Sequence, residues 1–111
     1  MTDELTRRFY KLGNVDQVPD PGTKVFTIGK RRILVARWEG KIYAMDDRCT
    51  HDDGPLGEGE LVDGEVECPR HGARFDIKTG KATCLPAVGA VRIYSIEVRE
   101  GEMYAGLPQN D

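Results

Sequence analysis

The sequence predicts an all-β protein built from short antiparallel strands. Short runs rich in β-branched and aromatic residues recur along nearly the whole chain, as is typical of strands. Glycine-containing turns separate these runs at regular spacing, which leaves no room for crossover helices in the first half. The thirteen glycines and six prolines favour turns over long helices. We therefore expect an antiparallel sandwich or barrel.

The first part of the chain is expected to form an antiparallel meander. Its predicted strands cover residues 9–12, 24–28, 32–38 and 41–45. Asn14 is expected to cap a single helical turn over residues 14–18, which Pro19 ends. The strands after it are joined by two tight turns that contain glycine, Gly29-Lys30 and Glu39-Gly40.

The middle and end of the chain carry shorter runs. Asp63-Gly64 between two apolar runs predicts a two-residue hairpin with strands at 60–62 and 65–67. Further strands are expected at 74–77, 81–83, 91–99 and 103–105, followed by a polar tail. The apolar positions of 91–99 change phase after Ser95, which predicts a β-bulge.

Length and charge bound the possible functions. We expect one domain over residues 1–111, with a base at about 1–45 and 87–111 and an inserted lobe at about 46–86. The net charge of −3 offers no basic face for nucleic acid. The sequence shows neither an apolar run of about 18 residues nor a signal-peptide core. Its three cysteines form no disulfide framework, which fits a reducing compartment, so we expect a cytoplasmic protein. We also expect it to be a monomer.

Two short motifs, each with one cysteine and one histidine, indicate a metal centre. They are Cys49-Thr50-His51 and Cys68-Pro69-Arg70-His71, and sixteen residues separate His51 from Cys68. Two thiolates and two imidazoles can hold one zinc ion in a tetrahedron. They can equally hold a [2Fe–2S] cluster, with the two cysteines on one iron and the two histidines on the other.

The way the ligands are divided between the motifs favours the cluster. Common zinc fingers pair cysteine with cysteine and histidine with histidine. Here each motif supplies one of each, so each loop can give a sulfur to one iron and a nitrogen to the other. The arrangement C-x-H, sixteen residues, C-x-x-H, with its flanks at 49–56 and 68–76, resembles the signature of Rieske iron–sulfur proteins. A zinc-stabilised binding module is the alternative from a different class.

The resemblance extends over almost the whole chain and implies a fold and a cofactor. Rieske-type ferredoxins have a β base formed by the first and last strands, with a cluster-binding lobe at one end. The resemblance implies one [2Fe–2S] cluster held by Cys49, His51, Cys68 and His71. It also places the two histidines at the exposed tip, where electrons would pass. Imidazoles in place of two thiolates raise the reduction potential above that of an all-cysteine cluster.

The same resemblance implies an electron carrier. The chain looks like the ferredoxin component of an aromatic-ring dioxygenase system, which takes single electrons from a flavin-dependent reductase and passes them to the Rieske centre of a terminal oxygenase. A terminal oxygenase also needs a mononuclear iron held by two histidines and a carboxylate. The chain has only two histidines, both assigned to the cluster, so we expect no enzyme active site on it. The small subunit of an assimilatory nitrite reductase, which has the same fold, is the other alternative.

Five residues outside the two motifs lie close enough in the sequence to bear on the site. We expect Cys84 to be a small buried hydrophobe rather than a ligand. For four aspartates near the motifs a solvated acidic face is the commoner explanation, and a rim for docking a partner is the alternative; they are Asp46, Asp47, Asp52 and Asp53.

The resemblance predicts a low reduction potential. High-potential Rieske proteins join their loops by a disulfide, where this chain has Gly54 and Arg70, and they place hydroxyls near the cluster, where it has Ala73 and Phe75. Because both features would stabilise the reduced cluster, we expect a midpoint near the low end of the Rieske range, on the order of −150 mV. A redox titration of the purified protein measures it, and a strongly positive midpoint would contradict the prediction.

Overall fold

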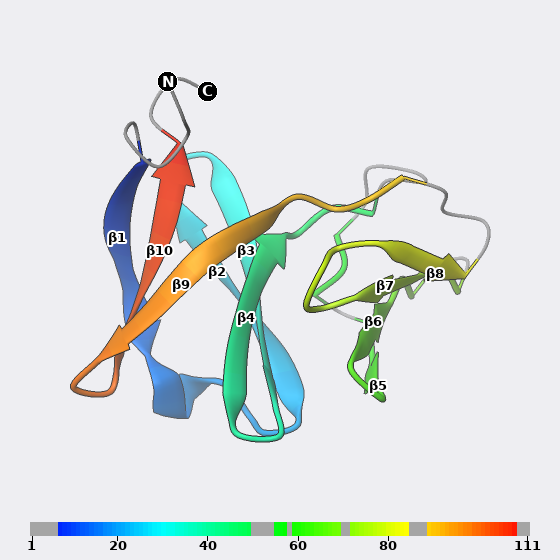
Figure 1. Cartoon of the computed structure of the whole chain (residues 1–111), viewed down its shortest axis with the longest axis horizontal. Helices are drawn as coiled ribbons and strands as arrows, with labels where there is room; N and C mark the ends of the chain where they lie inside the picture. Colours follow the sequence, from blue (N-terminus) through cyan, green and yellow to red (C-terminus); the bar gives the residue numbers. More distant parts are fainter. Residues whose placement is uncertain (1–6, 50–54, 58, 70–71, 85–88, 109–111) are drawn as a thin grey trace.

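The protein folds into two antiparallel sheets, and the all-β prediction is confirmed. A computed structural model describes residues 7–49, 55–57, 59–69, 72–84 and 89–108 (Figure 1). The larger sheet has six strands in the order β1-β10-β9-β4-β3-β2. Its strands are β1 (Arg7–Asn14), β2 (Gly22–Ile28), β3 (Arg31–Trp38), β4 (Lys41–Asp46), β9 (Ile93–Arg99) and β10 (Glu102–Pro108). The smaller sheet has the order β5-β6-β7-β8. Its strands are β5 (Leu61–Val62), β6 (Glu65–Glu67), β7 (Arg74–Asp76) and β8 (Ala82–Cys84).

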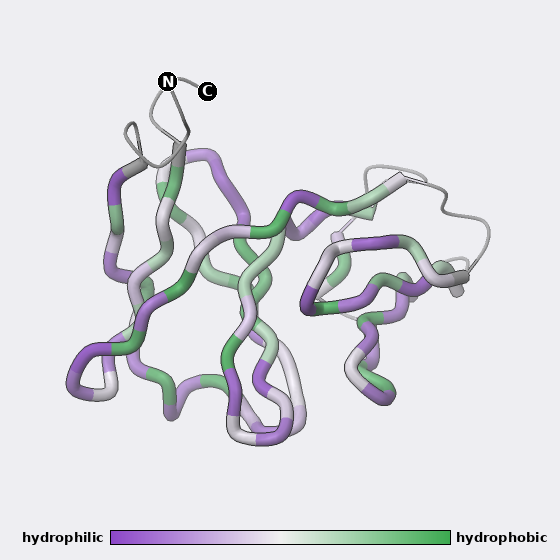
Figure 2. The backbone as a smooth tube through the Cα atoms, in the orientation of Figure 1, coloured by the Kyte–Doolittle hydropathy of each residue, from purple (hydrophilic) through white to green (hydrophobic). Residues whose placement is uncertain are grey.

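The six-stranded sheet curls around its own apolar core, and the smaller sheet lies beside β3 and β4 (Figure 1). Strand β9 links the two halves of the curl, because it pairs with β10 on one side and with β4 on the other. This long-range pairing closes the chain's last hairpin onto the meander formed by its first half. The hairpin tips at Glu39-Gly40 and Glu100-Gly101 are hydrophilic (Figure 2).

Strand β3 is buried on both faces. Ile33 and Val35 point into the core of the curled sheet, whereas Leu34 and Ala36 point toward the smaller sheet, and all four are at most 1% exposed. A strand covered on both sides has a continuous apolar sequence instead of an alternating one. The run of four apolar residues in β3 therefore marks the strand against which the smaller sheet packs.

Two apolar clusters divide the interior along this strand. The cluster inside the curl consists of Val18, Ile33, Val35, Ala44, Tyr94, Met103, Ala105 and Leu107. The cluster between the sheets consists of Leu34, Ala36, Met45, Cys49, Leu56, Val66, Cys68, Ala73, Phe75, Ile77 and Val91. Because both cysteines of the predicted metal motifs belong to the second cluster, the packing of the two sheets brings the motifs together.

The hairpin of the smaller sheet follows the prediction from Asp63-Gly64. Both residues have positive φ, 49° and 78°, as a tight two-residue turn requires, and Val62 pairs with Glu65. A Cβ on Gly64 would lie 3.0 Å from the Trp38 ring. Trp38 also packs against the cluster between the sheets, so its role is structural.

The turn after β1 is also as predicted. A 3₁₀ turn, η1 (Val15–Gln17), is capped by Asn14, whose side chain accepts a hydrogen bond from the Asp16 amide at 2.8 Å. Gln17 reaches back to the Asn14 amide at 2.7 Å, which completes a capping box that was not predicted. No helix in the part of the chain that the structure describes is long and apolar enough to cross a membrane.

The prediction of a bulge within residues 91–99 was wrong. Residues Ser95 to Arg99 pair with β10 without a shift in register. Val91 lies before the strand and packs in the cluster between the sheets, whereas Tyr94 and Ile96 pack inside the curl. The change of phase therefore marks the passage of the chain from one core to the other. Register shifts in the described strands lie elsewhere, between Lys11 and Gly13 in β1 and between Arg74 and Phe75 in β7.

Several strand ends also differ from the prediction. Strand β1 extends beyond 9–12 at both ends, and β10 runs to Pro108, through the first residues of the predicted tail. The two strands lengthen together because they pair with each other from Arg7–Pro108 to Asn14–Glu102. Each strand is lengthened by its pairing with the other, and a local sequence pattern does not reveal that pairing.

Gly59 is the point where the first motif's loop meets the smaller sheet. A Cβ at this position would overlap the backbone carbonyl of Glu67 in β6. That backbone cannot easily move away, because the Glu67 amide donates to the Glu60 carbonyl at 2.9 Å. Only glycine therefore allows the loop to approach β6 this closely.

We expect Gly59→Ala to lower the free energy of unfolding by about 3 kcal/mol, the upper end of the usual cost of overpacking. Gly40→Ala is the matched control, since a Cβ there meets nothing within 4 Å and carries only the strain of a φ of +77°, about 1 kcal/mol. Urea unfolding of both variants measures the difference. Equal losses would show that the contact with Glu67 places no demand on residue 59.

Candidate functional site

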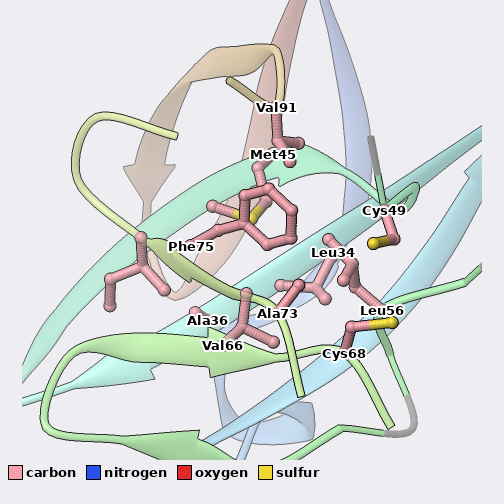
Figure 3. Packing of buried hydrophobic residues seen from close by; sticks show 11 residues of the cluster. Leu34, Ala36, Met45, Cys49, Leu56, Val66, Cys68, Ala73, Phe75 and Val91 are labelled. Atoms are coloured by element: carbon pink, nitrogen blue, oxygen red, sulfur yellow. The ribbon is translucent and has the colours of Figure 1, made fainter. Parts of the chain in front are cut away.

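Both motif cysteines are buried at the ends of strands. Cys49 comes shortly after β4 and Cys68 directly after β6, and their exposed fractions are 0% and 1%. They lie at the same side of the cluster between the sheets, near Leu34 and Leu56 (Figure 3). Neither thiol is in a disulfide. Two motifs nineteen positions apart in the sequence thus deliver two thiols to one dry region.

The second motif's loop is closed by its own backbone. The Cys68 amide donates to the Ala73 carbonyl at 2.6 Å, and the Gly72 amide donates to the Cys68 carbonyl at 3.1 Å. Gly72 has a φ of +77°, a conformation in which other residues are strained. The loop therefore leaves β6 at Cys68 and returns to β7 within a few residues, with Ala73 fully buried at its end.

The first motif's loop packs against the larger sheet. A Cβ on Gly57 would overlap the Val25 side chain of β2. Leu56 beside it is 0% exposed and belongs to the same cluster as the two cysteines. The end of this loop is turned by a hydrogen bond from the Gly59 amide to the Leu56 carbonyl, 2.9 Å long.

The predicted acidic rim is wrong for Asp47. This carboxylate is buried, with its side chain 0% exposed, and it accepts hydrogen bonds from Arg32 and from the amides of Leu56 and Gly57. It fastens the first loop to the sheet instead of facing a partner. The burial of Asp47 could not be predicted, because nothing in the neighbouring sequence distinguishes it from Asp46.

Asp46 is half-buried and is also engaged within the chain. The Tyr94 hydroxyl donates to its carboxylate at 3.3 Å and accepts from Arg31 at 3.0 Å. Burial, assisted by the Asp46 charge, raises the pKa of Tyr94, so the phenol keeps the proton that it donates. The other two aspartates of the predicted rim, Asp52 and Asp53, lie outside the described residues.

The two predicted histidine ligands, His51 and His71, lie outside the described residues, as do Gly54 and Arg70. Within the part of the chain that is described, no three cysteine, histidine or acidic side chains gather as a metal site. Cys84 lies in β8, opposite Arg74 of β7, and its side chain is not among those described. The prediction that it is a small buried hydrophobe stays a prediction.

The surroundings of the thiols fit an iron–sulfur cluster. The two sulfurs are soft ligands, and burial keeps them from water and from oxidants. Ala73 and Phe75, both 0% exposed, lie in the same apolar cluster and bring no hydroxyl to it. A cavity of about 330 Å³ borders Cys68. It is lined by Gly59, Glu60, Glu67, Cys68, Pro69 and Gly72.

A family model and two curated relatives match this chain. The family model, described as Rieske [2Fe-2S] domain, matches residues 8–95. The 3-phenylpropionate/cinnamic acid dioxygenase ferredoxin subunit of Photorhabdus laumondii is 38% identical over 91 residues, which cover 81% of this chain and 86% of the relative. The anthranilate 1,2-dioxygenase ferredoxin subunit of Burkholderia cepacia is 34% identical over 103 residues, which cover 93% and 95%.

Solved structures share the fold. The ferredoxin of carbazole 1,9a-dioxygenase from Nocardioides aromaticivorans IC177 has a TM-score of 0.83 at 30% identity and covers 87% of this chain and 95% of its own. A complex of reduced oxygenase and oxidised ferredoxin in carbazole 1,9a-dioxygenase matches with a TM-score of 0.81 at 30% identity, over 87% and 91%. A nitrite reductase small subunit from Mycobacterium tuberculosis has a TM-score of 0.80 over 91% and 96%, but at 16% identity it shows the fold alone.

Proposed function

Because this chain belongs to the Rieske [2Fe–2S] family, we propose that it is a one-electron carrier, the ferredoxin component of an aromatic-ring dioxygenase system. The observation that carries this proposal is the match to two ferredoxin subunits of aromatic dioxygenases over 86% and 95% of their lengths. The likeness to a nitrite reductase subunit is one of fold only, so it does not favour that alternative.

Four residues would hold the cluster: the buried thiolates of Cys49 and Cys68 and the imidazoles of His51 and His71. When bound, a cluster of this type takes up and releases one electron at a time. The chain's own part is to keep the two sulfurs dry and fixed. The closed loop at Cys68 and the packing of Leu56 and Gly57 against the larger sheet support that role.

The chain itself is not an enzyme in this proposal. A mononuclear iron site of the oxygenase type needs two histidines besides those of the cluster. The chain has two histidines in all, and the proposed cluster uses both. Oxidation of an aromatic substrate would therefore take place on another protein.

The proposed electron acceptor is the Rieske centre of a terminal oxygenase. A similar ferredoxin is found in complex with its oxygenase in the carbazole dioxygenase structure. The proposed donor is a flavin-dependent ferredoxin reductase. We also propose that the chain acts as a monomer in the cytoplasm, where reduced nicotinamide cofactors can supply such a reductase.

We expect Cys49→Ser and Cys68→Ser each to abolish the visible absorbance and the iron content of the purified protein, because each removes a thiolate ligand. Cys84→Ser is the matched control and should retain both. The measurement is iron and acid-labile sulfide per chain together with the visible spectrum. Full cluster in either motif variant, or its loss in the Cys84 variant, would show that the ligands are assigned wrongly.

We expect the dithionite-reduced protein to be reoxidised rapidly when it is mixed with an oxidised terminal aromatic-ring oxygenase. Stopped-flow absorbance follows the transfer, and Cys68→Ser serves as the control without a functional cluster. The oxygenases tested should include 3-phenylpropionate and anthranilate dioxygenases and any encoded beside this chain. If the cluster is present but none of them accepts its electron, the proposed role is wrong.

A further inference from the structure

A buried carboxylate lies at the start of the first motif's loop and does not belong to the proposed ligands. Asp47 is 5% exposed as a residue and 0% exposed at its side chain. A buried charge of this kind is costly unless it is paired and hydrogen-bonded. Each of its two oxygen atoms accepts two hydrogen bonds. One oxygen accepts from the loop that follows Cys49, and the other accepts from strand β3.

One oxygen of Asp47 holds the far end of the loop. Its Oδ1 accepts hydrogen bonds from the backbone amides of Leu56 and Gly57, both 2.8 Å long. These amides stand nine and ten residues further along the chain, on the other side of Cys49 and His51. The carboxylate therefore closes the loop that carries half of the proposed ligands.

The other oxygen fastens the closed loop to the larger sheet. Its Oδ2 accepts from Nε and Nη2 of Arg32 in β3, at 2.9 and 2.7 Å. The Asp47 amide also donates to the Arg32 carbonyl at 3.0 Å. The Arg32 side chain is 56% exposed, so it neutralises the buried charge from the solvent side. Its outer face borders a cavity of about 460 Å³, beside Lys30 and Arg48.

We infer that Asp47 is the positioning residue of the first cluster loop, and that Arg32 balances its charge so that the reduction potential of the cluster depends on the pair. This inference rests on the proposed function, because it presupposes the cluster. By holding the Leu56 and Gly57 amides, Asp47 fixes the far end of the loop that follows Cys49. The charges act on the potential because the reduced cluster carries one more negative charge than the oxidised one.

The two residues should shift the potential in opposite directions. Without the Arg32 charge, the negative charge of Asp47 is uncompensated and disfavours the electron added to a bound cluster, so the potential falls. With Asp47→Asn the remaining Arg32 charge favours the added electron, so the potential rises. In the double variant both charges are gone and the potential should return toward that of the unaltered protein.

The experiment compares Asp47→Asn, Asp47→Ala, Arg32→Gln and the Asp47→Asn/Arg32→Gln double variant as purified holoproteins. An asparagine oxygen can still accept from both loop amides. We therefore expect iron release to a chelator to speed up by about tenfold or more in Asp47→Ala, as for other lost partners around metal ligands, and much less in Asp47→Asn. Lys30→Gln is the control for the potential. It removes one positive charge from the cavity that Arg32 also borders, and it leaves the hydrogen bonds between Arg32 and Asp47 unchanged.

The outcomes separate this inference from the proposed function. An unaltered protein without iron or a reversible one-electron step would contradict the cluster itself. A loaded protein whose Asp47→Ala variant loses iron no faster would overturn the positioning role. If that variant does not fold, Leu56 and Gly57 amides that exchange with deuterium in the unaltered holoprotein as fast as exposed loop amides would overturn it instead, because both amides are hydrogen-bonded to Asp47. Potentials that move in the same direction in the two charge variants, or a shift in Arg32→Gln no larger than in Lys30→Gln, would overturn the charge balance.

Discussion

The structure depends on the packing of a small four-stranded sheet against the outer face of β3. Leu34 and Ala36 on that face and Phe75 on the small sheet belong to one cluster, and none is more than 1% exposed. A fully buried large apolar side chain contributes about 1.5–3 kcal/mol. Since Cys49 and Cys68 are members of this cluster, the packing that stabilises the fold also brings the two thiols together.

A metal centre in an apolar region needs its polar backbone to be satisfied. In the second loop, the Cys68 and Gly72 amides donate to carbonyls within the loop. In the first loop, two amides donate to Asp47, whose charge Arg32 balances. The two loops are therefore held by different means: the second by hydrogen bonds within its own backbone, and the first by the Asp47 side chain, which pairs with Arg32 of β3. A site fixed from two sides changes its geometry little when its charge changes, which suits rapid electron transfer.

Local signals in the sequence predicted the strands and turns well. The pairs Glu39-Gly40 and Asp63-Gly64 gave hairpins because a positive φ at a two-residue turn favours glycine. The cysteine and histidine spacing indicated the family for a similar reason, since ligand geometry is local. Three long-range features could not be predicted from the sequence: the pairing of β9 with β4, the packing of Val91 between the sheets, and the burial of Asp47. Each depends on a partner distant in the chain.

The proposed centre is a pair of bridged irons held by Cys49, His51, Cys68 and His71. Metal analysis combined with low-temperature EPR of the purified, dithionite-reduced protein is the decisive test of this centre. We expect two irons and two labile sulfides per chain, with an EPR signal that appears on one-electron reduction and disappears on reoxidation. Colourless protein with one zinc per chain and no reversible electron uptake would contradict it.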